Sequence, residues 1–91
     1  MAYVHITRTP NQGFGEYERI RQLLGDEPID GQRAHHVGVV DGALVIADVW
    51  ESRAHADRFA AERLFPAFDR AAAGPPADTM VLSFDEATQD A

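Results

Sequence analysis

Residues 35–52 hold two apolar runs on either side of Asp41-Gly42, a pattern that predicts a β-hairpin with a two-residue turn. Both turn positions of a type I′ hairpin need a positive φ angle, which Asp and Gly tolerate better than most residues. If Val40 lies opposite Ala43, the turn fixes the register of both strands. The pairs expected on one face are then Val39 with Leu44, Val37 with Ile46, His35 with Asp48, and Arg33 with Trp50. This face ends in a polar and aromatic cluster, whereas the opposite face carries small apolar residues.

The rest of the chain predicts two more strands and two helices. Residues 3–8 and 80–85 alternate between polar and apolar positions and read as a first and a last strand. A first helix is indicated by apolar residues at spacings of three and four, with Gly25 as its stop. The residues of this stripe are Phe14, Tyr17, Ile20, Leu23 and Leu24.

A second helix is expected to begin after Ser52, a favourable N-cap residue. Pro66 lacks an amide hydrogen, so it should kink this helix or start a short new turn. The inward face of the helix is expected to carry His55 or Ala56, Phe59, Ala60, Arg63 and Leu64.

The element order is therefore β-α-β-β-α-β, which predicts an α+β ferredoxin-like sandwich: a four-stranded antiparallel sheet with two helices on one face. We expect a single domain over residues 1–91, with residues 86–91 as a frayed tail. Both faces of the hairpin are apolar, and two helices on one face leave the other face uncovered. A homodimer in which two sheets pack face to face is therefore predicted from burial alone.

Charge and composition exclude several classes of function. Fifteen acidic residues stand against eight arginines and no lysine, giving a net charge of −7, which disfavours binding to nucleic acid or anionic lipid. The absence of cysteine rules out disulfides, thiolate metal sites and cysteine nucleophiles. No apolar run approaches the roughly 20 residues that span a bilayer, and the first residues lack the basic start of a signal peptide. A cytoplasmic protein without membrane contact is expected.

The polar end of the hairpin supplies the candidate chemistry. His35 opposite Asp48 brings an imidazole within hydrogen-bonding reach of a carboxylate, which orients the ring as a general base requires; the alternative is a structural cross-strand pair. Trp50 could stack a flat aromatic ligand with Arg33 holding an anion beside it, or it could be a core residue. Adjacent His35 and His36 point to opposite faces and cannot chelate one ion simply, so no metal site is predicted.

Several short motifs resemble the dimeric α/β-barrel superfamily, and within it small bacterial proteins similar to antibiotic-biosynthesis monooxygenases. The resemblance covers about residues 35–68. Its motifs are His36-Val37-Gly38, Asp41-Gly42, Asp48-Val49-Trp50-Glu51-Ser52, Asp57-Arg58-Phe59, and Glu62-Arg63-Leu64 with Pro66. It implies sheets paired face to face into a barrel, with one pocket per protomer between helices and sheet and Trp50 facing into it.

The resemblance implies a cofactor-independent, monooxygenase-like oxidation of an aromatic or polyketide-type substrate. Members of that kind also use an Asn, and none is available near this site, since Asn11 lies in a loop. Haem-degrading relatives carry a His where this chain has Phe59 and Ala60, so that activity is disfavoured. Two alternatives remain: a polyketide cyclase that uses His5 with His35, and a non-catalytic dimer that binds a metabolite. The candidate catalytic residues are His35 and Asp48, and the candidate substrate-binding residues are Arg33, Trp50, His55, Phe59, Arg63 and Tyr17.

Overall fold

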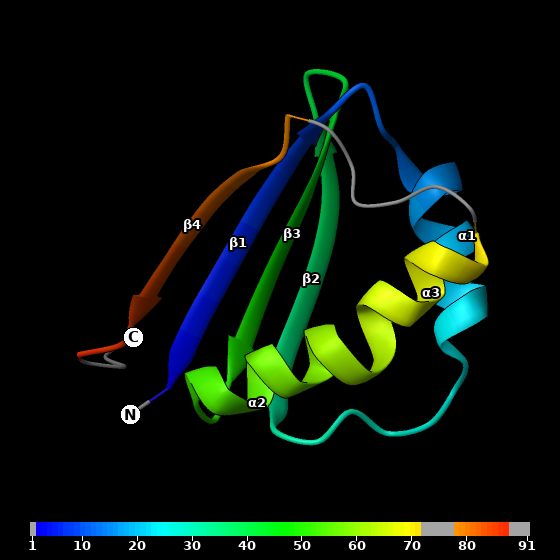
Figure 1. The fold of residues 1–91 in the computed structure, drawn as a ribbon. Coiled ribbons are helices and arrows are strands. Elements are labelled where there is room, and N and C mark those ends of the chain that lie inside the picture. Colours follow the sequence, from blue (N-terminus) through cyan, green and yellow to red (C-terminus); the bar gives the residue numbers. More distant parts are fainter. Residues whose placement is uncertain (1, 72–77, 88–91) are drawn as a thin grey trace.

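The computed structural model describes residues 2–71 and 78–87 of the chain, and it has the expected order of strands and helices (Figure 1). The strands are β1 (Tyr3–Pro10), β2 (Gln32–Val40), β3 (Ala43–Trp50) and β4 (Met80–Asp85). The helical elements are α1 (Phe14–Leu24), α2 (Arg53–Phe59), the π-helical turn η1 (Ala60–Leu64) and α3 (Phe65–Arg70).

The four strands form one antiparallel sheet in the order β2-β3-β1-β4, with the helices on one face (Figure 1). This is the ferredoxin-like α+β fold, so the predicted fold class is confirmed. Side chains on the helix-covered face are buried: Trp50 is 2% exposed, Leu44 5% and Tyr3 8%. The core therefore lies between this face and the helices.

The Asp41-Gly42 turn has the predicted geometry, with φ angles of 50° and 73°. The strands β2 and β3 pair as the turn dictates, with Val39 opposite Leu44 and His35 opposite Asp48. The predicted register therefore holds from the turn as far as His35.

Beyond Ala34 the prediction that Arg33 lies opposite Trp50 is wrong. The register shifts between Gln32 and Ala34, so Trp50 pairs with Gln32 and Arg33 is an extra, exposed residue in β2. A β-bulge of this kind places two residues opposite one and cannot be counted out from the turn. Gly31 anchors the strand beyond the bulge, because its carbonyl accepts a 2.8 Å hydrogen bond from the backbone N–H of Glu51.

The second helical region begins and bends where the sequence predicts. The Ser52 Oγ accepts a 3.3 Å hydrogen bond from the backbone N–H of His55, which caps α2. Pro66 has no N–H to donate to residue 62, and its ring would clash with that carbonyl in a regular α-helix. The chain widens into the π turn η1 just before it, closed by the Phe65 N–H on the Ala60 carbonyl, and continues as α3.

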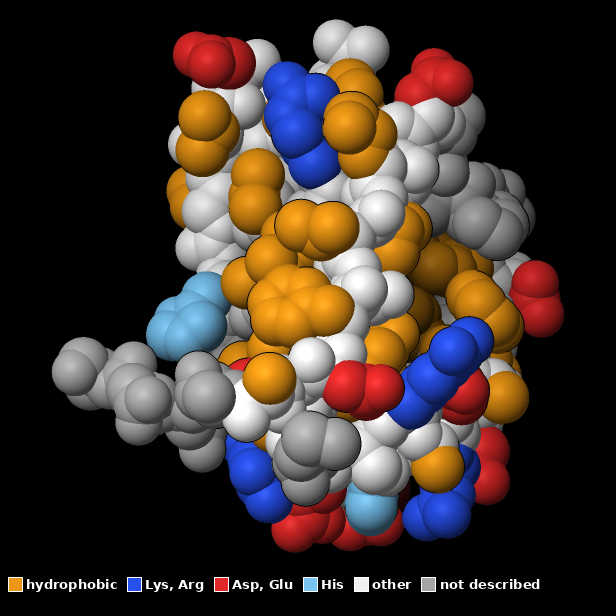
Figure 2. Space-filling view, turned by 90° about the vertical axis from the view of Figure 1, so that its left-hand side faces the viewer, with side chains coloured by type: hydrophobic (Ala, Val, Ile, Leu, Met, Phe, Trp, Pro, Cys, Tyr) orange, Lys and Arg blue, Asp and Glu red, His pale blue; other side chains and the backbone are white. Residues whose placement is uncertain are grey.

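The outer face of the sheet, away from the helices, is apolar and uncovered in the single chain. Figure 2 shows hydrophobic side chains gathered across the middle of this side of the molecule. Its most exposed large members are Met80, Leu82, Phe84 and Val40, which are 63%, 62%, 46% and 55% exposed. Strand β4 lies beyond the reach of the helices, so even Val81, on its other face, is 59% exposed.

The two ends of the described chain meet beside β1. The backbone N–H of Glu86 donates a 2.7 Å hydrogen bond to the carbonyl of Ala2. The predicted frayed tail, residues 86–91, otherwise falls mostly outside the described residues, which end at 87. Within residues 2–71 and 78–87, no helix has both the length and the apolarity needed to cross a bilayer.

Candidate functional site

Three side chains form a continuous hydrogen-bonded chain between α1 and the sheet. The Nδ1 atom of His35 lies 2.5 Å from Oδ1 of Asp48, and its Nε2 atom lies 2.7 Å from the hydroxyl of Tyr17. The rings of Tyr17 and His35 also stack, with centroids 5.8 Å apart and planes 26° apart. Both nitrogens of the imidazole are therefore engaged, one by a carboxylate and the other by a phenol.

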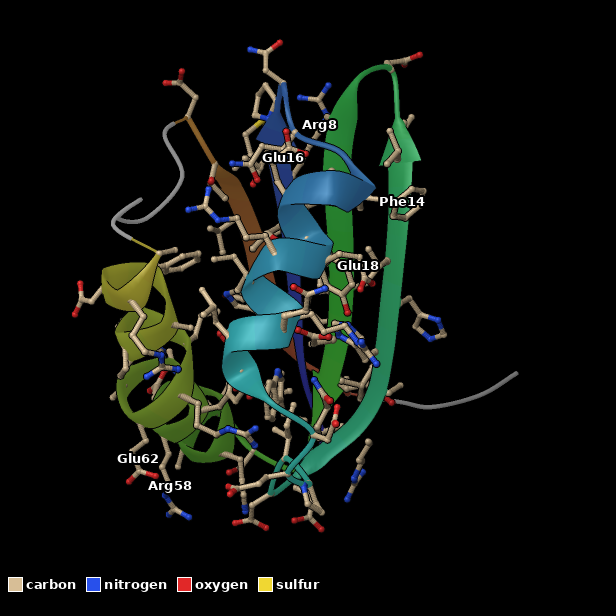
Figure 3. All side chains as sticks on the ribbon, turned by 90° about the vertical axis from the view of Figure 1, so that its right-hand side faces the viewer. Arg8, Phe14, Glu16, Glu18, Arg58 and Glu62 are labelled. Carbon is tan, nitrogen blue, oxygen red and sulfur yellow. The ribbon has the colours of Figure 1, made fainter. Side chains whose placement is uncertain are left out.

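Each member of this Tyr17–His35–Asp48 chain is positioned by a local feature of the sequence. The Asp41-Gly42 turn sets the cross-strand pairing of His35 with Asp48. The apolar stripe of α1 turns Tyr17 toward the sheet, and the carboxylate of Glu16 accepts a 2.9 Å hydrogen bond from the backbone N–H of Gly13 at the start of that helix. Figure 3, seen from the helix side, shows α1 lying in front of the sheet, with Glu18 on its surface.

Burial controls the pKa values of Asp48 and Tyr17, the two ends of the Tyr17–His35–Asp48 chain. The side chain of Asp48 is only 14% exposed, and desolvation raises the pKa of its carboxyl above the ordinary value, outweighing the opposing effect of the hydrogen bond and charge of His35. Burial likewise raises the pKa of Tyr17, so its phenol is neutral at physiological pH. Once Asp48 is ionised it can only accept, so Nδ1 of His35 donates to it and Nε2 accepts from the Tyr17 hydroxyl.

His5 approaches the same carboxylate from the other side. It is the β1 partner of Asp48 in the sheet, just as His35 is the β2 partner. The face to which His5 belongs, which the sequence left open, is therefore the helix-covered face. Asp48 lies between the two histidines, and the positive charge of either would stabilise its ionised form.

The predicted aromatic residues lie deeper. Trp50 is almost fully buried, with its ring centroid 5.4 Å from that of Phe59. The guanidinium of Arg63 lies 5.9 Å from the centre of the Phe59 ring. It donates hydrogen bonds of 3.0–3.1 Å to the carbonyls of Leu24, Glu27 and Pro28, and so holds the end of α1 and the loop after it.

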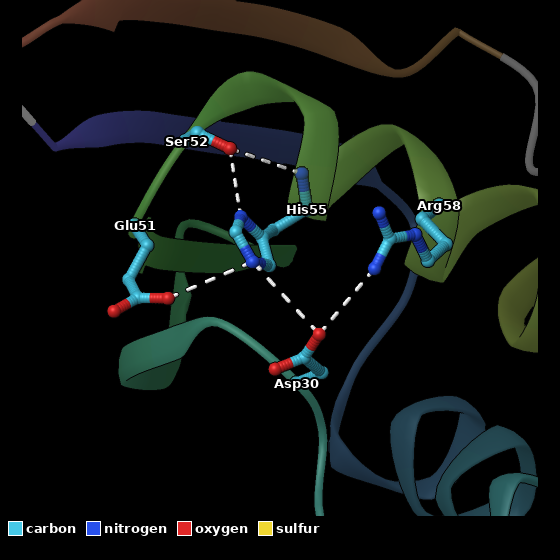
Figure 4. A network of polar contacts seen from close by, with 5 residues as sticks. All are labelled: Asp30, Glu51, Ser52, His55 and Arg58. Carbon is cyan, nitrogen blue, oxygen red and sulfur yellow. Dashed lines mark hydrogen bonds and ion pairs between the residues drawn. The ribbon is translucent and has the colours of Figure 1, made fainter.

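His55 belongs to a second polar cluster at the start of α2 (Figure 4). Its Nδ1 atom lies 2.7 Å from the Ser52 hydroxyl, and its Nε2 atom faces Glu51 at 3.6 Å and Asp30 at 3.8 Å. A Cβ atom at Gly31 would overlap the imidazole, so the ring packs directly on that backbone.

A pocket of about 200 Å³ opens between the loop before β2 and the second helical region. Three of the predicted binding residues, His55, Phe59 and Arg63, line it together, and Arg58 and Glu62 on the outer side of the helix complete its rim (Figure 3). The Tyr17–His35–Asp48 chain lies outside this lining. Phe59 lines the pocket and also contacts the buried Trp50.

Sequence reasoning missed the partner of Tyr17. Its helix stripe was visible, but the stripe does not say which strand residue it meets, so the hydrogen bond to His35 could not be found. The charge of Arg21, one turn along α1, favours the phenolate of Tyr17, but the charges of Glu18 and Asp48 oppose it, and burial raises the pKa of the phenol overall. Arg33, the predicted anion-binding residue, is exposed in the bulge of β2.

Among the described residues, no three His, Asp or Glu side chains are arranged to hold a metal ion.

Solved structures with the same fold are known. The chain matches a variant of SnoaB, a cofactor-independent oxygenase from Streptomyces nogalater, at 14% identity and a TM-score of 0.68, over 97% of this chain and 95% of the other. It matches a monooxygenase from the gene ActVA-Orf6 of Streptomyces coelicolor, in complex with nanaomycin D, at 14% identity and a TM-score of 0.68, over 99% and 91%. An antibiotic biosynthesis monooxygenase matches at 19% identity and a TM-score of 0.67, over 97% and 100%.

These neighbours are antibiotic-biosynthesis-monooxygenase-like proteins of ferredoxin-like fold, so the resemblance predicted from residues 35–68 is confirmed at the level of the fold. Comparison with protein-family models and with curated proteins gives no match. At such low identities the likeness concerns the fold alone, and the chemistry must be argued from the side chains of this chain.

Replacing Asp48 by Asn should change how stability depends on pH. Because the pKa of Asp48 is raised on folding, the native state holds more protons than the unfolded state near that pKa. The free energy of unfolding of the wild type therefore falls as the pH rises from about 4 through the pKa of the folded protein. Asn does not titrate, so the stability of the variant relative to the wild type should increase over this range.

This comparison is made by urea unfolding between about pH 4 and pH 7. The same comparison is then made between His35→Gln and the His35→Gln/Asp48→Asn double variant. The Gln amide still donates to the carboxylate but does not titrate, so any remaining pH dependence belongs to Asp48. A difference that stays constant or shrinks as the pH rises would contradict the assignment.

Proposed function

We propose that this protein is a small-molecule enzyme that oxidises an electron-rich aromatic or polyketide-type substrate with molecular oxygen and without a bound cofactor. The observation that carries the proposal is the engagement of His35 between Asp48 at 2.5 Å and Tyr17 at 2.7 Å. A carboxylate that holds Nδ1–H leaves Nε2 as an oriented proton acceptor, which is the arrangement of a general base.

The proposed reaction converts an activated ring CH₂ group beside phenolic hydroxyls into a quinone carbonyl. His35 receives one proton from the substrate, and the resulting carbanion transfers one electron to O₂. The substrate radical and superoxide then combine, and the proton returns from His35 to give a hydroperoxide. Loss of water from the hydroperoxide forms the carbonyl. One O₂ is consumed, with one oxygen atom in the product and the other in water.

The names of the structural neighbours support this class of reaction. One is a cofactor-independent oxygenase and another is a monooxygenase in complex with nanaomycin D. In this chain we assign the aromatic wall of the substrate site to Phe59, backed by the buried Trp50. We assign to His55 and Arg63 the polar rim of the pocket that Phe59 also lines. Arg33 stays a candidate contact only at the open edge of β2.

A second function is favoured by the position of His5. Two histidines flank one carboxylate, His5 from β1 and His35 from β2, which could supply an acid and a base to a cyclisation that consumes no oxygen. The absence of Asn from this cluster favours a third function, a dimer that binds a metabolite without turnover. Oxygen uptake distinguishes the first function from both alternatives.

The His35→Gln variant should lose most of its oxygen uptake with dithranol, a hydroxylated anthrone whose oxidation follows the scheme above. Loss of a positioned general base lowers turnover by about a hundredfold or more. The measurement uses an oxygen electrode and the absorbance of the quinone product. His36→Gln is the matched control, because this neighbouring histidine lies on the opposite face of the sheet and should leave turnover unchanged. Wild-type turnover that survives in His35→Gln would exclude His35 as the base.

We also propose that the functional form is a homodimer whose protomers pack through the outer faces of their sheets. The apolar residues that carry this proposal are Met80, Leu82 and Phe84, which are each about half to two-thirds exposed in the single chain. Leaving such a continuous apolar face in water is unfavourable, and a second copy supplies a matching face by symmetry.

Two neighbouring residues of β4 allow a matched test of this assembly by light scattering. Leu82 points to the outer face and is 62% exposed, whereas Val81 points to the opposite face and is 59% exposed. Leu82→Glu should place two buried charges in the interface and give a monomer, while Val81→Glu should keep the dimer. A wild-type monomer, or equal behaviour of both variants, would argue against this interface.

A further inference from the structure

We propose that Tyr17 is the catalytic residue that touches the substrate and passes its proton to His35. This inference rests on the proposed function and deepens it. In the scheme above His35 receives a proton, but the structure leaves no free nitrogen on its ring, because Asp48 and Tyr17 occupy both. A substrate hydroxyl therefore reaches Nε2 either by displacing Tyr17 or through it.

The contacts of Tyr17 favour the second route. Its hydroxyl lies 2.7 Å from Nε2, and its ring stacks on the imidazole, so two contacts hold it in place. It projects from the first turn of α1, where the carboxylate of Glu16 accepts a 2.9 Å hydrogen bond from the backbone N–H of Gly13. A swing away from His35 would break the hydrogen bond and the ring stacking together.

The order of the hydrogen bonds, with a buried carboxylate at one end, gives the Tyr17–His35–Asp48 chain a direction. The Asp48 side chain is 14% exposed and that of His35 is 36% exposed, so the carboxylate is the inner end. Tyr17 is half-buried, less exposed than His35, and its phenol is the end of the hydrogen-bonded chain opposite the carboxylate. A ligand that contacts the end of the chain away from Asp48 meets the phenol.

The proton movement along this chain is balanced. The substrate O–H gives its proton to Oη of Tyr17 as the original Tyr17 proton moves to Nε2 of His35. After this transfer Tyr17 is neutral again, and His35 is an imidazolium paired with the Asp48 carboxylate. The substrate, which enters as the enol tautomer of its CH₂–ketone form, becomes an enolate, which is the carbanion of the scheme above, and the same steps in reverse return the proton.

The resting arrangement also selects the chemical class of the substrate. The Tyr17 hydroxyl already donates to His35, so it offers only lone pairs to a ligand. It therefore selects a hydrogen-bond donor, a phenol or enol O–H, over a carboxylate. The charge of Arg21 favours an anion at this position, whereas the charges of Glu18, which pairs with Arg21 at 3.7 Å, and of Asp48 oppose it.

The test is a double-mutant cycle on oxygen uptake with dithranol. Tyr17→Phe should lower turnover by about a hundredfold, similar to the loss in His35→Gln. Because both residues serve one proton path, the double variant should be no slower than the slower single variant. Tyr3→Phe, which changes the other tyrosine of the chain, is the matched control and should keep wild-type turnover.

The outcomes separate this inference from the proposed function. If His35→Gln is inactive while Tyr17→Phe keeps its turnover, His35 is the base and the role of Tyr17 is overturned. Losses that multiply in the double variant also overturn it, since Tyr17 would then act independently of His35. If neither variant affects oxygen uptake, the proposed function itself fails.

Fluorotyrosine provides a readout that does not depend on the loss of a side chain. Fluorination acidifies the phenol and keeps its shape, so it is introduced at Tyr17 in a Tyr3→Phe protein. If Tyr17 carries the proton, the pH profile of turnover should move to lower pH. An unchanged profile would mean that Tyr17 only lines the site, and would overturn the inference.

Discussion

The pairing of His35 with Asp48 across two strands is the interaction on which the proposed chemistry depends. It exists because a two-residue turn with positive φ angles at Asp41 and Gly42 sets the register of the hairpin. A slip by one residue would send both side chains to the other face. The helix layer then buries the carboxylate until desolvation outweighs its hydrogen bond in setting its pKa. A local turn thus determines the electrostatics of the site.

The same sheet imposes a second constraint through its outer face. A ferredoxin-like sandwich of this size has helices for one face only, and the sequence places apolar side chains on both. Chemistry and assembly are therefore assigned to opposite faces of one hairpin: His35 and Asp48 face the helices, while His36 and Val40 face outward. In the proposed dimer, association would bury the outer face and leave the helix layer and the pocket beside it exposed.

Much of the architecture could be predicted because it follows from local rules. The turn chemistry, the Ser52 cap and the break before Pro66 are each determined by a few neighbouring residues. The position of Arg33 could not be predicted in this way, because a bulge adds a residue that only the folded strand reveals.

The contacts between helices and sheet were equally hidden from the sequence. The stripe of α1 indicates that Tyr17 faces inward, but the strand residue it meets depends on how the helix is placed over the sheet. Arg63 reads as a cation on an inward helix face, yet it is engaged by three carbonyls of the chain between Leu24 and Pro28. Such pairings depend on packing at long sequence distance, and the candidate site is built from them.

The most direct test of the account is the tautomer of His35 in solution, measured by two-dimensional ¹⁵N–¹H NMR of the imidazoles at about pH 8. A chain that runs from Tyr17 through His35 to an ionised Asp48 requires a proton on Nδ1 and none on Nε2. The account predicts that tautomer, with a slowly exchanging Nδ1 proton that disappears in Asp48→Asn. A proton on Nε2, or rapid averaging of both tautomers, would contradict the account, because Tyr17 would then have no acceptor at His35.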